Sequence, residues 1–344
     1  MDQRLVNTKS NSKLISIFFF NEVVTLDNLL KSIDECYKAT PWKRSSQFGY
    51  CNRILIASKL LESLNNETYI PKNPRKFTIS ERGKTRNIDS YTFVDKVVQK
   101  LLAQNILLKI INKSCIYDTY ACLKGRGTEK ARDRLADFLV SDKNKYNEFY
   151  IAKLDISKYF ESIKINKMLE LIKDLVDDKL FRLFQRMYRE DYLSLGSELN
   201  QLFATLYLNR LDHKTKEYYQ IKHYVRYQDD FILTSNNFEY LKFVIANIEI
   251  DLRDIGLKLN TKKTKVEKFK KIEFLKVQFK FNKDGNLCKR KINKSIRFLF
   301  KKIRKIKKLN LEKKYLINYR KSILGQFKKL NNFRQVSLEL NKLF

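Results

Sequence analysis

Three aspartates occupy positions where a carboxylate would be costly to bury without a cation. Asp229 and Asp230 lie between two short runs, 223–227 and 231–234, whose aromatic and branched residues are typical of strands in a buried sheet. Asp155 ends a third run of this kind. Carboxylates from adjacent strands can hold a pair of divalent ions, one activating an attacking hydroxyl and the other stabilising the leaving oxygen. The pattern therefore indicates metal-assisted phosphoryl transfer.

The ligand type indicates which ions to expect. Oxygen-only ligands favour Mg²⁺, or Mn²⁺ in its place, so we expect two such ions. The alternative for an isolated Asp-Asp pair is a polar surface turn. Against it, the chain has 71 Lys and Arg and 38 Asp and Glu, a formal net charge of +33. A protein this basic has little reason to bury acids unless they bind a cation.

Alternating strands and helices must position these acids. We expect strands over 75–79, 85–88, 149–156, 224–227, 231–235 and 272–281. We expect helices over 27–37, 52–65, 94–111, 168–176, 180–188, 199–216 and 241–255, and only helices after residue 295. The middle of the chain is therefore mixed, whereas its C-terminal part is all helix.

The composition indicates a globular protein with a polyanionic partner. Of the 344 residues, 43% are hydrophobic, which is enough for a sizeable core and argues against a disordered chain. Eight glycines and three prolines exclude collagen-like and low-complexity classes. The surplus of positive charge favours a polyanion, and composition alone leaves RNA, DNA and an acidic membrane surface open.

More than half of the surplus charge lies in about a sixth of the chain. Residues 256–308 hold 21 Lys and Arg against three acids, a local net charge of +18. Near the end of this run, apolar residues recur at helical spacing and leave Lys301, Lys302 and Lys305 on the outward face. The pattern predicts a helix that packs on the protein and faces phosphates.

Cysteine usage and hydropathy indicate a cytoplasmic protein. The five cysteines are never spaced as C-x-x-C, and with only two histidines a zinc site is not expected. An odd, scattered set of cysteines suits a reducing compartment. Because no apolar run approaches the length of a membrane span, we expect no membrane partner.

Several segments, taken in order, resemble the characteristic motifs of reverse transcriptases. The tetrad Tyr227-Gln228-Asp229-Asp230 resembles their Y-x-D-D motif. The other segments are 82–88 (the basic fingers hairpin), 118–128 (the segment before the palm), 154–160 (motif A), 195–201 (motif B), 256–264 (motif D), 274–276 (motif E, the primer grip) and 322–331 (a thumb helix of bacterial enzymes). The order and spacing of the segments, over roughly residues 60–335, make the resemblance specific.

The resemblance implies an α+β fold of the right-hand polymerase type, with fingers, a β/α palm built on an RRM-like antiparallel sheet with helices, and an all-helical thumb. The implied parts are an N-terminal helical extension (1–48), fingers with a basic hairpin at 75–89 (49–135), a palm with the catalytic motifs (136–275), and a primer grip followed by a basic helical thumb (276–344). The chain most resembles bacterial stand-alone enzymes, which include group II intron-like, diversity-generating and phage-defence-associated reverse transcriptases.

The resemblance also implies site residues. Asp155, Asp229 and Asp230 would be the catalytic carboxylates and bind the metals, together with the backbone of Ile156. The residues implied to contact the nucleotide are Lys84, Arg86, Ile156, Ser157, Lys158, Tyr159, Phe160, Gln201, Lys262 and Lys263. Those implied to contact nucleic acid are Arg126, Phe274, Leu275, Lys276, Lys301, Lys302 and Lys305.

Some of these roles have alternatives. Phe160 falls at the steric-gate position, where a ring would exclude the ribose 2′-hydroxyl, and the alternative is a core aromatic. Lys84 and Arg86 would clamp the incoming phosphates, or else they are solvated strand cations. Lys262 or Lys263 would protonate pyrophosphate, and the resemblance does not decide between them.

Two residues depart from the family pattern, and one acid lies outside it. Asn200 replaces the usual Ser before Gln201, which would contact the nascent base pair or template, and Lys276 replaces the common Gly of motif E. Neither change removes a metal ligand, so we do not expect a dead enzyme. Asp212 is expected to be an acid on a helix surface.

The expected activity is RNA-templated DNA synthesis with two Mg²⁺ ions, in a bacterial phage-defence or retroelement system. The implied partners are an RNA template, a DNA or RNA primer and dNTPs, with a structured noncoding RNA or an accessory protein as further candidates. One alternative is untemplated or protein-primed DNA synthesis. Another is a non-catalytic RNA-binding scaffold, against which the presence of all three carboxylates argues.

Overall fold

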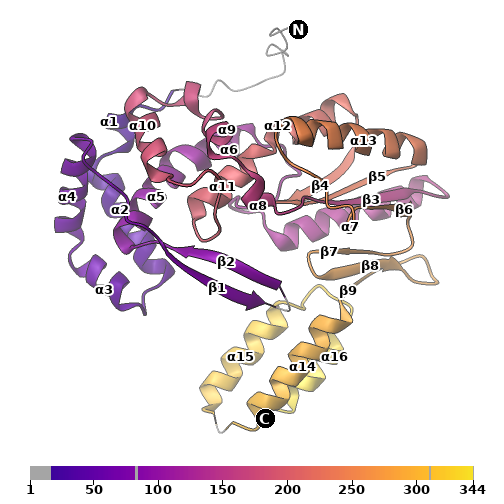
Figure 1. The fold of residues 1–344 in the computed structure, drawn as a ribbon. Helices are drawn as coiled ribbons and strands as arrows, with labels where there is room; N and C mark the ends of the chain where they lie inside the picture. The colour runs from indigo at the N-terminus through magenta and orange to yellow at the C-terminus, as the bar shows by residue number, and fades with distance from the viewer. Residues whose placement is uncertain (1–16, 82–83, 310, 344) are drawn as a thin grey trace.

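The computed structural model describes residues 17–81, 84–309 and 311–343, without the side chains of Glu81 and Lys84. It shows a mixed α/β protein with antiparallel sheets (Figure 1). The strand orders in the described residues are β1-β2, β4-β5-β3-β6 and β7-β8-β9. The prediction of a mixed fold built on an antiparallel sheet is thus confirmed.

The four-stranded sheet carries the predicted catalytic acids. Its strands are β3 (Tyr150–Asp155), β4 (His223–Tyr227), β5 (Asp230–Ser235) and β6 (Lys265–Lys268). Strand β5 pairs with β4 on one side and with β3 on the other, while β6 extends the sheet beyond β3. Because side chains alternate between the faces of a strand, Ile151 and Ile232 lie in one core cluster, and Leu154 and Leu233 in another.

Helices cover both faces of this sheet, which explains why β3, β4 and β5 are buried along most of their length. The helices concerned are α7 (Thr128–Lys145) in the first cluster, and α11 (Glu198–Tyr207) and α13 (Phe238–Asp254) in the second. The prediction had left α7 out, because its sequence is dominated by charged residues. Its buried face is formed mainly by Ala131, Leu135 and Leu139.

The N-terminal third of the chain is a group of helices from which a β-hairpin projects (Figure 1). The helices are α1 (Phe20–Val23), α2 (Leu26–Ala39), α3 (Arg44–Cys51), α4 (Arg53–Asn65), α5 (Phe93–Leu102) and α6 (Leu108–Ser114), and the hairpin strands are β1 (Arg75–Glu81) and β2 (Lys84–Ser90). Thr25 and Thr92 begin α2 and α5, because each side-chain oxygen accepts a backbone N–H of the first turn. A π-helical stretch joins α5 to α6, so the predicted helix over 94–111 is continuous but locally widened.

Short elements fill the middle of the chain. They are α8 (Tyr159–Ser162), α9 (Ile165–Leu169), a 3₁₀ turn (Lys173–Leu175), α10 (Asp178–Met187), α12 (Asn209–His213) and a π-helical stretch (Lys214–Tyr218). The helix predicted over 168–176 is wrong. The chain leaves the helix after Leu169, and its end instead bonds with the N-terminal segment, where the Phe18 N–H donates to the carbonyl of Leu175 at 2.9 Å.

The C-terminal part comprises a small sheet and three helices. They are β7 (Ile272–Phe274), β8 (Val277–Phe281), β9 (Leu287–Lys291), α14 (Asn293–Lys307), α15 (Lys313–Gly325) and α16 (Phe333–Asn341). The single strand predicted over 272–281 is therefore wrong, because the chain turns back after Phe274. The three helices share a core that includes Ile303 and Val336, and the basic face of α14 is exposed as predicted. Among the described residues no helix is long and apolar enough to traverse a lipid bilayer.

Candidate active site

A two-residue turn carries one of the predicted carboxylates, Asp229, and the strand after the turn begins with another, Asp230. Gln228 and Asp229 join β4 to β5, with Tyr227 opposite Asp230. Gln228 has a φ of 55°, the left-handed value that tight hairpin turns require at their first central position. On the other side of β5, Asp230 lies opposite Asp155 of β3. Directly opposed residues of antiparallel strands have their β-carbons about 5 Å apart, so the sheet brings these acids together.

A lysine forms an ion pair with the carboxylate of Asp155. This aspartate is only 5% exposed, and Lys263 Nζ lies 2.6 Å from each of its two oxygens. The Asn260 backbone N–H donates to the Asp155 carbonyl at 2.7 Å, which holds the loop carrying the lysine beside β3. Lys262 and Lys263 are consecutive, exposed residues of one turn, and Lys263 is the one whose side chain reaches the acid.

The electrostatics of the cluster favour a cation. Burial, together with the carboxylates of Asp230 and Asp155, raises the pKa of Asp229 to about 6. The donors are all carboxylate oxygens, which suit Mg²⁺ or Mn²⁺. In the described part of the chain, however, no three His, Cys, Asp or Glu side chains form a group that could hold a metal ion. The residue types fit such an ion, and binding it requires the side chains to change position.

The backbone after Asp155 is anchored to the loop before β6. Ile156 is buried and forms an isolated antiparallel bridge with Leu259. The Ser157 N–H donates to the Lys258 carbonyl at 2.9 Å. The backbone predicted to bind the nucleotide, 156–159, is therefore bonded directly to the loop that leads to Lys262 and Lys263.

The next three residues turn the chain into α8. Lys158 has a φ of 45°, which permits the turn. Tyr159 is buried, and its hydroxyl donates to the Ala204 carbonyl of α11. Phe160 meets the Tyr159 ring edge-on, with centroids 5.7 Å apart. The segment that follows β3 is thus fixed to α11.

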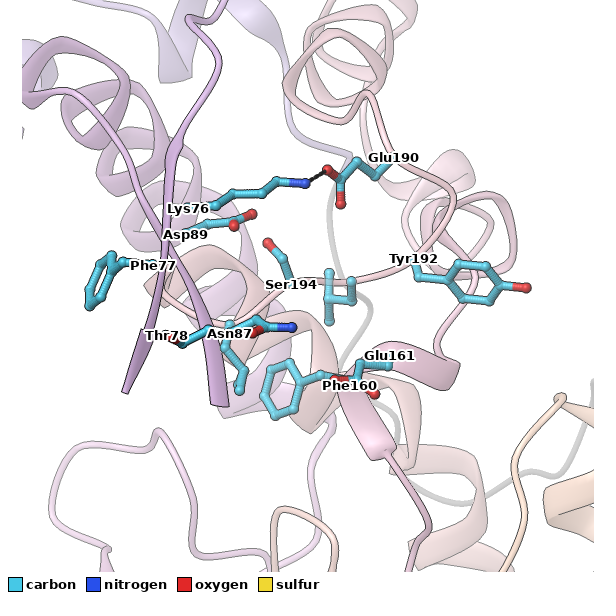
Figure 2. Close-up of a pocket in the computed structure, with 12 residues that line it drawn as sticks. Lys76, Phe77, Thr78, Asn87, Asp89, Phe160, Glu161, Glu190, Tyr192 and Ser194 are labelled. Atoms are coloured by element: carbon cyan, nitrogen blue, oxygen red, sulfur yellow. Dashed lines mark hydrogen bonds and ion pairs between the residues drawn. The ribbon is translucent and has the colours of Figure 1, made fainter. Parts of the chain in front are cut away.

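Phe160 also borders a cavity of about 670 Å³ between the hairpin and the loop before α11 (Figure 2). Thr78 and Asn87 line the cavity from the two hairpin strands, and Lys76 pairs with Glu190 at its edge (Figure 2). The ring both packs on the core and faces this space. Asp155, Asp229 and Asp230 are not among its described lining residues, so the carboxylate cluster does not form this cavity.

The β1–β2 hairpin is hydrogen-bonded to the loop before α11 and packs closely against Gly196 of that loop. The Asp89 N–H donates to the Leu195 carbonyl at 2.8 Å. Gly196 has a φ of 122°, and a β-carbon there would lie 2.1 Å from the Asp89 carbonyl oxygen. Only glycine permits this approach. Arg86 lies exposed on β2, while the side chain of Lys84 falls outside the described residues.

Asn200 and Gln201 are neighbours in α11 that differ in burial. Asn200 is buried; its amide donates to the Ser194 carbonyl at 2.9 Å and its oxygen accepts the Tyr188 hydroxyl at 3.0 Å. The departure from the family pattern at this position therefore supports the loop before α11. Gln201 is exposed, and its carbonyl accepts a hydrogen bond from the side chain of Gln228 in the turn at 3.4 Å.

The expectation that Asp212 lies on a helix surface is wrong. Asp212 has 0% exposure and forms an ion pair with Arg226, which is also fully buried. Sequence analysis missed this pair because Asp212 belongs to a short helix with charged neighbours. The available signal was Arg226, a charged residue within a strand of otherwise apolar and aromatic residues.

A large part of the sequence matches a known protein family. The family model described as "Reverse transcriptase (RNA-dependent DNA polymerase)" matches residues 70–279, more than half of the chain. The chain belongs to the reverse transcriptase family. A comparison with curated protein sequences gives no match.

Solved structures similar to this reverse transcriptase chain include two of Candida tropicalis telomerase. Apo telomerase truncated from its C-terminal domain is 14% identical, with a TM-score of 0.48 over 63% of this chain and 55% of the other. Apo telomerase is 16% identical, with a TM-score of 0.47 over 61% of this chain and 47% of the other. The chain thus matches about half the length of these telomerase chains.

The reverse transcriptase match ends inside β8, just after the predicted primer grip. There, Leu275 and Lys276 form the β7–β8 turn with φ values of 48° and 69°. The departure from Gly at Lys276 therefore places a side chain where glycine is unstrained. Arg132 of α7 donates to the Leu275 carbonyl from Nε at 3.1 Å and Nη2 at 2.5 Å, which anchors the turn. Phe274, just before it, is buried.

Helix α7 also forms ion pairs with β9 and with the turn after α15. Lys329 Nζ lies 3.0 Å from Glu129 and 2.9 Å from Asp133, and Lys289 Nζ lies 3.2 Å from Asp133. Arg126, which precedes α7, donates to the carbonyls of two earlier residues, at 2.6 and 2.8 Å. Its guanidinium thus supports the segment before α7, and contact with nucleic acid stays a prediction.

Proposed function

We propose that this reverse transcriptase family chain is an RNA-directed DNA polymerase that copies an RNA template by two-metal nucleotidyl transfer. One observation carries the proposal. Asp155 lies opposite Asp230 on neighbouring strands, with Asp229 in the adjoining turn, in a chain whose net charge is +33. Acids gathered in so basic a protein suit a site that binds cations and the phosphates of nucleic acid.

Asp155, Asp229 and Asp230 would hold two Mg²⁺ ions, assisted by the backbone of Ile156. Such ions lower the pKa of an attacking hydroxyl and stabilise the leaving oxygen. The chain's own residues orient the reactants: the anchored backbone of 156–159 would receive the triphosphate. Because Lys263 is the lysine that reaches the carboxylates, it is the better candidate to protonate pyrophosphate.

We assign the helices and hairpin of 49–135 to the fingers, 136–275 to the palm and 276–344 to the primer grip and thumb. The projecting hairpin and the sheet with helices on both faces support this division. So does the exposed basic face of α14, where Lys301, Lys302 and Lys305 would contact the phosphates of the template–primer duplex. Such contacts predict binding that weakens steeply with salt.

The proposed activity can be tested on a primed RNA template with labelled dNTPs and Mg²⁺. We expect template-dependent extension by the wild-type protein and none by Asp229→Asn, with RNA affinity nearly unchanged in filter binding. Full extension by that variant would overturn the catalytic assignment. Products that form equally well without template RNA would instead show untemplated synthesis.

We also propose a bacterial retroelement or phage-defence setting, in which a structured noncoding RNA or an accessory protein supplies template or primer. Support comes from the resemblance of 322–331 to thumb helices of bacterial enzymes. Sequencing the RNA and DNA that copurify with the protein tests this setting. Recovery of one defined RNA would support it, and unrelated cellular RNA would contradict it.

A further inference from the structure

Arg226 is the largest fully buried side chain in the described part of the chain. It belongs to β4, two residues before the turn that carries Asp229. An arginine with no exposure must bond nearly all its donors within the protein, because burying an unpaired charge is prohibitively costly. The partners it has therefore show what this side chain holds in place.

The guanidinium bonds to three separate segments. Its Nε and Nη2 donate to the two carboxylate oxygens of Asp212 at 2.7 and 2.5 Å. Nη1 donates to the backbone carbonyl of Gln228 in the catalytic turn at 3.1 Å. Nη2 also donates to the backbone carbonyl of Thr205 in α11 at 3.0 Å. One side chain thus joins the turn, α11 and α12.

Asp212 is satisfied as completely as its partner. Beyond Arg226, its carboxylate accepts the Tyr224 hydroxyl at 2.6 Å and the Thr119 hydroxyl at 2.8 Å. Burial alone would lower the pKa of Arg226, but Asp212 raises it above the ordinary value, so the arginine stays charged.

The backbone of Arg226 is fixed as well. Its N–H donates to the Asp118 carbonyl, and its carbonyl accepts the Tyr120 N–H, both at 3.0 Å. Strand β4 is thereby paired with the segment before α7 on the edge away from β5. The end of β4 is therefore hydrogen-bonded along both of its edges, and the Arg226 side chain also bonds it to α11 and α12.

Well-packed apolar residues often stabilise a core at least as much as a buried ion pair does. Stability alone therefore does not explain why this pair is present. What apolar residues cannot do is hold two backbone carbonyls at fixed positions. We propose that Arg226, held by Asp212, is a positioning residue that sets the place of the Gln228–Asp229 turn relative to α11. This inference rests on the proposed polymerase function of the turn. It goes beyond that function by naming the side chain that keeps the turn in register.

The test compares Arg226→Lys with the wild-type protein. Lysine keeps the charge next to Asp212, but it lacks the planar fork that reaches both carbonyls. We expect kcat for dNTP incorporation to fall by about 10- to 100-fold, as for other groups that orient metal ligands. The KM for dNTP and the affinity for RNA should stay within about twofold, because the positioned groups act on the reacting atoms. Wild-type kcat in this variant would overturn the proposal.

A second variant distinguishes a loss of positioning from a loss of folding. In Arg226→Met/Asp212→Asn both charges are removed together, so no unpaired charge is buried. We expect cooperative unfolding near the wild-type temperature together with the same loss of kcat. A loss of kcat only in step with a lower unfolding temperature would show a purely structural role and overturn the inference. The matched control is Arg182→Lys, at an exposed pair with Glu67, which should leave both quantities unchanged.

Binding of Mn²⁺ alone, followed by its electron paramagnetic resonance signal, separates this inference from the proposed function. We expect about 10-fold weaker binding in Arg226→Lys, because Asp229 is displaced. If the wild-type protein binds Mn²⁺ but does not polymerise, the proposed function fails and this comparison still decides the role of Arg226. Equal Mn²⁺ affinity in the two proteins would overturn that role.

Discussion

Lys263 Nζ lies 2.6 Å from both carboxylate oxygens of Asp155. The ammonium group therefore lies where a metal ion bound to Asp155 would lie. A divalent ion that binds Asp155 must share these oxygens with the lysine or displace it. Because Lys263 is carried by a loop that is itself bonded to the backbone of 155–157, metal binding and the position of this loop are linked.

Lys263→Met should tighten the binding of metal while slowing the reaction. Removing the competing ammonium frees both oxygens of Asp155, so we expect Mn²⁺ to bind about 10-fold more tightly in the absence of nucleotide. Calorimetric titration with MnCl₂ measures this change, and steady-state kinetics should show a lower kcat. The control is Lys262→Met, which should leave Mn²⁺ affinity unchanged; equal effects of both variants would contradict the prediction.

Stability of the metal-free protein should fall as the pH rises toward neutrality. The pKa of Asp229 is raised from 3.8 to about 6, so between these values the folded state holds a proton that the unfolded chain has lost. The free energy of unfolding therefore decreases through this window. In EDTA at pH 7.5, Asp229→Asn should melt at a higher temperature than the wild-type protein, and the difference should vanish near pH 4. Asp137→Asn, at an exposed position of α7, should leave the pH trend unchanged. An unchanged or lower melting temperature for Asp229→Asn would contradict the account.

Gly196→Ala should destabilise the protein and impair activity. The new β-carbon would lie 2.1 Å from the Asp89 carbonyl oxygen, at a φ of 122°, so the hairpin must move. We expect a loss of about 1–3 kcal/mol in a urea titration, from backbone strain and displacement. The control is Gly285→Ala, where φ is 81° but nothing lies within 4 Å. Because this control carries strain without the clash, an equal loss in both variants would show that the contact with Asp89 is unimportant.

Phe160→Ala should relax the choice of sugar. Phe160 stands at the proposed steric-gate position and borders the cavity of about 670 Å³, so removing the ring would make room for a ribose 2′-hydroxyl. We expect the ratio of kcat/KM for dNTP over rNTP to fall by at least about 10-fold. Single-nucleotide incorporation measures this ratio. Phe243→Ala, an exposed ring on α13, is the control; an unchanged ratio in Phe160→Ala would refute the steric-gate role.

The sequence predicted what local spacing determines and missed what tertiary contacts determine. The strands ending at Asp155 and flanking Asp229 were predicted because their apolar residues are contiguous and their acids stand at the ends. The turn at Leu275 and Lys276 was missed, since two non-glycine residues with positive φ leave no glycine to mark it. The burial of Asp212 depends on Arg226, 14 residues later, and no periodicity in one segment reveals such a pair.

The helices on both faces of the β3–β5 sheet also have a consequence for motion. Its amides should exchange with solvent only when the whole domain unfolds, because neither face can open alone. We therefore expect the backbone that carries the acids at its end to be among the most rigid parts of the described structure. Any opening and closing around a substrate falls to the parts attached at its margins, the projecting β1–β2 hairpin and the helices after β9 (Figure 1).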